Sequence, residues 1–102
     1  MQFPTANDRN QRVTILRKEF NGDEWIEMIT PVCAIGQVDP RTALEHNASL
    51  IVGALAITGD TVILKFPLRL ADLDPDEFKV PLDMLVQAGD MLEEKFTGQD
   101  VF

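Results

Sequence analysis

Two residues of this sequence have the chemistry of catalytic groups: its single cysteine, Cys33, and its single histidine, His46. A Cys–His pair can act as nucleophile and base when the two lie within hydrogen-bond reach and a third group orients the histidine. Glu45 cannot be that group, because adjacent residues of a helix do not face one another. Cys33 also lies in the apolar run PVCAIG, where cysteine is typically a small buried hydrophobe. We therefore predict no catalytic residues and no enzyme activity.

The alternating acids Asp72, Asp74 and Asp76 invite comparison with a calcium-binding loop. Such a loop needs a glycine at its sixth position, where this sequence has Glu77. A turn followed by the capped start of a helix explains these acids better. The glycines form no phosphate-binding motif of the GxGxxG kind. We predict neither a metal ion nor a cofactor.

The composition is that of one small domain with an acidic surface. The chain has 102 residues, 45% of them hydrophobic, and a net charge of −8, enough for one core. The charge argues against nucleic acid and anionic membranes as partners. A polar N-terminus, a single cysteine and the lack of an apolar run of about 20 residues predict a cytoplasmic protein.

The charge is unevenly distributed along the chain. From Asp72 onward the sequence has nine acidic residues but only two basic ones, Lys79 and Lys95. They indicate either a solvated helix face or a surface that steers a basic partner.

The first half of the chain has the pattern of a β-hairpin. Residues 13–20 and 25–32 are rich in β-forming residues, and Asn21-Gly22 between them is a strong signal for a two-residue turn, although a four-residue loop is an alternative. Pro31 has no N–H to donate, so it predicts a bulge, an edge position or the end of the strand. Residues 1–11 are expected to form a flexible arm.

A short helix and a second hairpin are predicted next. Asp39 is a good N-cap and Pro40 suits the first helical position, so we expect a helix from Pro40 to about Ser49. Residues 50–58 and 61–68 should pair antiparallel through the turn Gly59-Asp60. The first of these strands is nearly all apolar, which predicts a central strand covered on both faces or a dimer seam.

A long amphipathic helix is predicted from Asp74-Pro75 to about Thr97. Glu77, three residues after Asp74, completes a capping-box-like start. Pro81 removes one helical hydrogen bond and should kink the helix. One face carries apolar side chains and Gly89, spaced alternately by four and three residues; it comprises Phe78, Leu82, Leu85, Gly89, Leu92 and Phe96. Gly89 predicts close packing, either against a second copy or against the sheet of the same subunit.

The stretch from Ala43 to Asp90 resembles type III secretion chaperones and YbjN-like proteins. The resemblance lies in a short helix with Leu44 and Asn47, the strand Gly53–Ile57, the turn Gly59-Asp60, a strand ending in Pro67-Leu68, and Leu73-Asp74-Pro75 before an amphipathic helix. It implies an α+β fold with a twisted antiparallel sheet, a tendency to form homodimers, and a role in holding other proteins. It brings no catalytic residues. The element order ββ-α-ββ-α follows from the two hairpins and two helices predicted above.

We therefore predict a single α+β domain over residues 1–102, acting as a non-enzymatic, chaperone-like or adaptor-like module and forming a homodimer. Its partner is expected to be another protein or peptide. The alternative is a small-ligand-binding or regulatory domain with a pocket between the sheet and the C-terminal helix. The candidate interface follows the apolar strand and the helix face around Gly89: Leu50, Val52, Gly53, Leu55, Leu85, Gly89, Leu92 and Phe96.

Overall fold

The computed structural model describes residues 2–4, 10–51, 53–72 and 74–97. These residues form the predicted α+β fold, with a four-stranded antiparallel sheet and a second, two-stranded one that was not predicted. None of the helices in the described ranges is long and apolar enough to cross a membrane. The elements are β1 (Gln2–Pro4), β2 (Asn10–Arg12), β3 (Thr14–Phe20), β4 (Asp23–Ala34), α1 (Pro40–Asn47), β5 (Ala54–Thr58), β6 (Thr61–Arg69), the 3₁₀ turn η2 (Leu70–Asp72) and α2 (Pro75–Thr97).

The first hairpin, β3–β4, has the predicted two-residue turn. Asn21 and Gly22 both have positive φ, 53° and 80°, as a type I′ turn requires. The two strands pair in register from Phe20↔Asp23 outward. Strand β4 runs on to Ala34, and its register with β6 shifts between Pro31 and Cys33. The predicted bulge is thus present, and it lets a proline sit in a strand that has neighbours on both sides.

The second hairpin, β5–β6, is confirmed with a two-residue turn at Gly59-Asp60. The main sheet has the order β3-β4-β6-β5, so β5 is an edge strand. The prediction of a central strand beginning at Leu50 is therefore wrong. The backbone reaches Ala54 through Gly53, whose φ of +76° is left-handed rather than extended. A Cβ on Gly53 would also lie 2.7 Å from the carbonyl oxygen of Lys65.

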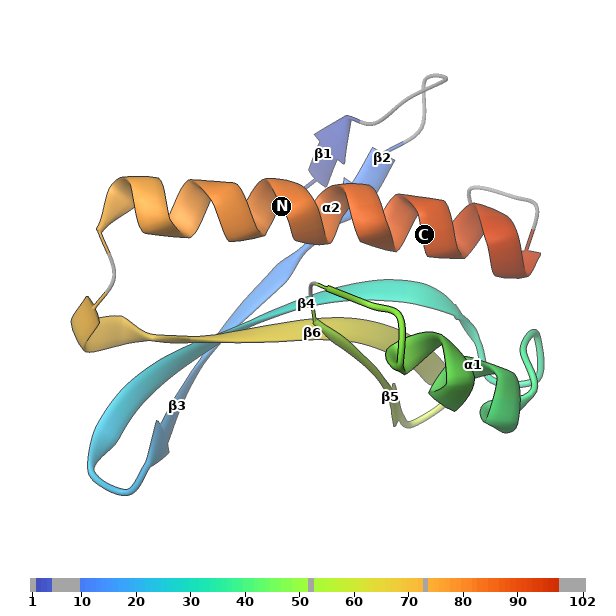
Figure 1. Cartoon of the computed structure of the whole chain (residues 1–102), viewed down its shortest axis with the longest axis horizontal. Helices are drawn as coiled ribbons and strands as arrows, with labels where there is room; N and C mark the ends of the chain where they lie inside the picture. The colour runs from blue at the N-terminus through green and yellow to red at the C-terminus, as the bar shows by residue number, and fades with distance from the viewer. Residues whose placement is uncertain (1, 5–9, 52, 73, 98–102) are drawn as a thin grey trace.

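Helix α2 covers one face of the main sheet (Figure 1). Its predicted start is confirmed: the Glu77 N–H donates to Asp74 Oδ1 at 2.8 Å and the Asp74 N–H donates to Glu77 Oε2 at 3.4 Å. The helix continues through Pro81 and is drawn as one straight rod in Figure 1, so the predicted kink is wrong. Buried side chains just after Pro81 hold the helix on the core, which comprises Val13, Met28, Val32, Cys33, Leu55, Val62, Leu64, Leu82, Leu85, Val86 and Leu92.

The N-terminal segment is more ordered than the sequence indicates. Strands β1 and β2 pair antiparallel, and Gln11 of β2 is fully buried. Its Nε2 donates to Thr30 Oγ1 and to the Pro31 carbonyl, both at 2.7 Å. The expectation of a flexible arm is therefore wrong for residues 2–4 and 10–11, because these long-range hydrogen bonds attach β2 to β4. Residues 1 and 5–9 lie outside the described ranges.

Candidate functional site

The helix part of the predicted interface lies inside the subunit. Leu85, Gly89 and Leu92 are all buried, and a Cβ on Gly89 would lie 2.6 Å from Thr30 Cγ2 of β4. Gly89 thus serves the packing of α2 on its own sheet, the second of the two predicted alternatives. Phe96 is half-buried at the end of the same face. A homodimer that uses α2 has to use another face of the helix.

The strand part of the predicted interface is divided between core and surface. Leu55 is buried in the core, whereas Leu50 and Gly53 are half-buried before β5. Val52 lies outside the described residues. Ile51, which the prediction did not include, is 90% exposed. The structure therefore brings the predicted residues to two places, the core and the loop between α1 and β5.

The cysteine and the histidine lie on different elements, and each packs against apolar groups. Cys33 on β4 is fully buried. Burial raises the pKa of its thiol, and the nearby charge of Glu93 raises it further, which keeps the thiol in its unreactive protonated form. His46 on α1 packs edge-on against Phe96, with ring centroids 5.2 Å apart. Among the described residues, no group of His, Cys, Asp and Glu side chains could hold a metal ion.

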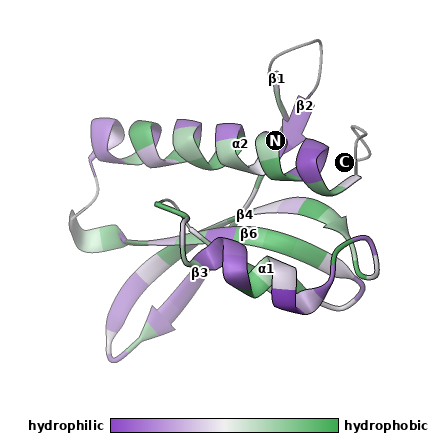
Figure 2. Cartoon of the chain, turned by 45° about the vertical axis from the view of Figure 1, so that its right-hand side comes forward, coloured by the Kyte–Doolittle hydropathy of each residue, from purple (hydrophilic) through white to green (hydrophobic). Residues whose placement is uncertain are grey.

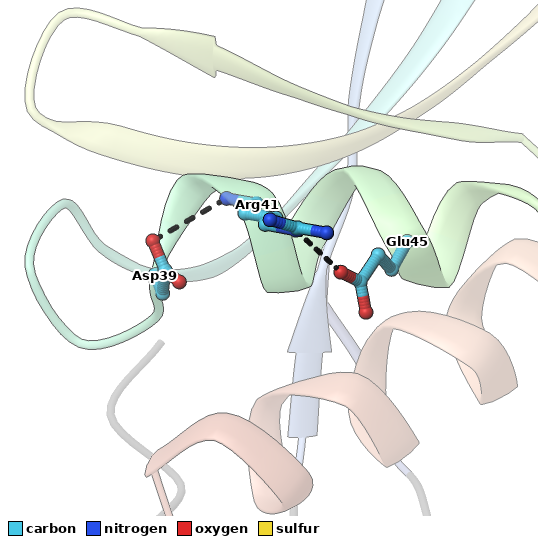
Figure 3. A network of polar contacts seen from close by, with 3 residues as sticks. All are labelled: Asp39, Arg41 and Glu45. Carbon is cyan, nitrogen blue, oxygen red and sulfur yellow. Dashed lines mark hydrogen bonds and ion pairs between the residues drawn. The ribbon is translucent and has the colours of Figure 1, made fainter.

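Helix α1 lies beside the edge of the sheet, and side-chain hydrogen bonds stabilise both of its ends. Asp39 Oδ1 accepts a long 3.4 Å hydrogen bond from the Arg41 N–H, and Arg41 Nε donates to Glu45 Oε1 at 3.0 Å (Figure 3). At the other end of α1, the Asn47 side chain bonds both polar backbone groups of Leu55. The Leu55 N–H donates to Asn47 Oδ1 at 2.7 Å, and Asn47 Nδ2 donates to the Leu55 carbonyl at 3.3 Å. The amide thus takes the place of a neighbouring strand at Leu55.

An apolar groove separates α1 from β5 and the end of β4. It encloses about 190 Å³, and its lining includes Ile35, Val38, Ala43, Leu44, Leu55 and Ile57. Leu44 is 67% exposed and Ile57 52% exposed, so the groove opens to solvent. The predicted alternative placed a pocket between the sheet and the C-terminal helix, whereas this groove lies beside α1.

A second apolar surface runs along the solvent-facing side of α2. Val80, Met84 and Met91 are exposed, and with Gln87 they are spaced by four, three and four residues. Ile51 stands beside them, next to a hollow lined in part by Leu50, Met84, Ala88 and Met91. We call Ile51, Val80, Met84 and Met91 the methionine face. Figure 2 shows hydrophobic residues recurring along α2, and the 4-3-4 spacing of this face is readable in the sequence.

The face of the main sheet opposite α2 carries a charged cluster. Glu27 of β4 lies between Lys18 of β3 and Lys65 of β6, with Nζ–Oε separations of 3.0 and 3.5 Å. Burial by itself raises the pKa of Glu27, but the hydrogen bonds and positive charges of the two lysines outweigh it, so the net effect is a lowered pKa. These ion pairs connect three neighbouring strands of the sheet, β3, β4 and β6.

In comparisons with known proteins, no family model matches the chain and no curated protein matches it either. The assignment of a function therefore depends on the surfaces described above.

Proposed function

We propose that this protein is a non-enzymatic protein-binding module, chaperone-like or adaptor-like, that acts as a homodimer in the cytoplasm. The observation that supports it is the methionine face. Contiguous exposed apolar surface is characteristic of sites of protein association, and methionine adapts its shape to varied partners.

The occupant that we propose for the methionine face is a second copy of the chain. The spacing of Val80, Met84, Gln87 and Met91 is that of helices which pair along a narrow apolar seam. In a two-fold antiparallel pair of α2 helices, Met84 of one protomer lies against the partner's Met91, and the small Ala88 leaves room at the centre. Ile51 is 90% exposed and lines the same hollow as Met84 and Met91, so a pair that buries these methionines also buries Ile51. A two-fold interface uses the same patch of both copies, and the methionine face supplies one such patch.

Analytical ultracentrifugation tests the dimer. The wild type at tens of micromolar should sediment with twice the 11.4 kDa mass of the chain, and Met84→Glu/Met91→Glu should sediment as a monomer. Leu44→Glu is the control, because it places a charge on an exposed apolar residue outside the methionine face. A wild-type mass of 11.4 kDa that does not change with concentration would refute the dimer.

Native mass spectrometry of the purified protein separates the two classes of function. A co-purifying peptide supports the protein-binding module. A bound small molecule with no peptide supports the alternative, a small-ligand-binding domain, for which the groove of about 190 Å³ is a possible site.

A further inference from the structure

Strand β5 leaves one pair of backbone groups open on the outer edge of the sheet. Leu55 directs its N–H and C=O away from β6, since Asn47 bonds both. Along an antiparallel strand this direction repeats every second residue, so the N–H and C=O of Ile57 face the same way. Within the described part of the chain, no group bonds them. On the outer edge of β5, the backbone hydrogen-bonding groups are therefore occupied at Leu55 and open to a partner strand at Ile57.

The groove lies directly beside this open pair. Ile57 is one of its lining residues, together with Leu44 and Ile35. A strand added at Ile57 would place the side chain opposite Ile57 on the same face of the sheet, toward the groove. An apolar cavity of about 150 Å³ holds a benzene molecule, so about 190 Å³ accommodates one aliphatic side chain.

Asp60 belongs to the β5–β6 turn, three residues after the groove residue Ile57. Its backbone carbonyl accepts a 2.7 Å hydrogen bond from the N–H of Ile35, another residue that lines the groove. The Asp60 carboxylate forms no ion pair with any described residue, whereas Glu45 on α1 is paired with Arg41. This charge and the net charge of −8 favour a basic partner over a second copy, which would bring the same charges.

We propose that the β5 edge and the groove bind an extended peptide, which adds as a strand at Ile57. The peptide inserts one aliphatic side chain into the groove and directs a lysine or arginine side chain, two positions away toward the β5–β6 turn, to Asp60, while its other basic residues are favoured by the net charge of −8. The proposal rests on the proposed function, since it names the kind of partner that such a module would hold. It places that partner on a surface separate from the methionine face.

The test uses a fluorescein-labelled peptide, Thr-Lys-Val-Leu-Val-Lys-Thr with blocked ends, and fluorescence anisotropy with the full chain. Methylating the backbone nitrogen of the central leucine should weaken binding about tenfold, because it removes a hydrogen bond to Ile57. Replacing both lysines by glutamate should weaken binding at least as much. No binding of the parent peptide up to about 1 mM, or equal binding of the N-methylated peptide, would overturn the proposal.

Protein variants locate the site. Leu44→Glu should weaken binding about tenfold, and Asp60→Asn should weaken binding severalfold and flatten its salt dependence. Met84→Glu/Met91→Glu is the control and should bind as the wild type does, even where it is monomeric, so this proposal and the dimer can fail separately. Circular dichroism checks folding, and the peptide variants keep the test decisive if Leu44→Glu unfolds. A loss of dimer in Leu44→Glu would assign this edge to a second copy and overturn the peptide proposal.

Discussion

Gly89 lets α2 approach β4 closely, because a side chain there would collide with Thr30 Cγ2. Gly89→Ala should lower the free energy of unfolding by about 1–3 kcal/mol through overpacking, although alanine favours the helix by up to about 1 kcal/mol. Chemical denaturation measures the change. The same substitution in a Thr30→Ser background should cost less, since the colliding methyl is gone and the hydroxyl remains. An equal cost in both backgrounds would contradict the collision.

Glu27 should contribute stability that depends on pH. Because the pKa of its carboxyl is lowered below the ordinary value of 4.5 by Lys18 and Lys65, the contribution is present above pH 4.5 and is lost as the pH falls through the folded-state value. Glu27→Gln should therefore destabilise the protein by about 1 kcal/mol at pH 7 and progressively less as the pH falls below 4.5. Glu24→Gln is the control, because its partner Arg17 is exposed and such pairs contribute little. A Glu27→Gln effect that does not change with pH would rule out this origin.

Asn47 connects two elements, since its side chain lies at the end of α1 and bonds the edge of β5. Asn47→Ala should lower the free energy of unfolding by about 1–2 kcal/mol, because both groups of Leu55 lose their partner. Thermal and chemical denaturation measure the loss. Ser49→Ala removes an exposed hydrogen bond in the same loop and should change stability by less than about 0.5 kcal/mol. If the two variants behave alike, the amide does not support the strand.

At the scale of the whole molecule, the two proposed interactions should respond to salt in opposite directions. Each copy carries a net charge of −8, so screening should strengthen association through the apolar methionine face. Peptide binding joins opposite charges and should weaken over the same range. Sedimentation and anisotropy between 50 mM and 500 mM sodium chloride measure both. A parallel response would mean that the charges do not act as argued.

The sequence by itself determined the features that have local causes. Asn21-Gly22 and Gly59-Asp60 each supply the backbone conformation that a two-residue hairpin turn needs, and Asp39-Pro40 and Asp74-Pro75 each begin a helix where predicted. The apolar face of α2 followed from its spacing. These features depend on residues a few positions apart, so the α+β class could be predicted without knowledge of the tertiary structure.

The tertiary structure decided which surfaces are covered. Strand β5 lies at the edge because β4 pairs with β6 and not with β5, although helix α1 and β5 come between them in the sequence, and no local pattern specifies that pairing. For the same reason Gly89 faces Thr30 and not a second copy, and Gln11 becomes buried in a segment expected to be flexible. The sequence shows which residues are apolar. Whether such a residue joins the core or stays exposed, as Met84 and Met91 do, depends on contacts between distant parts of the chain.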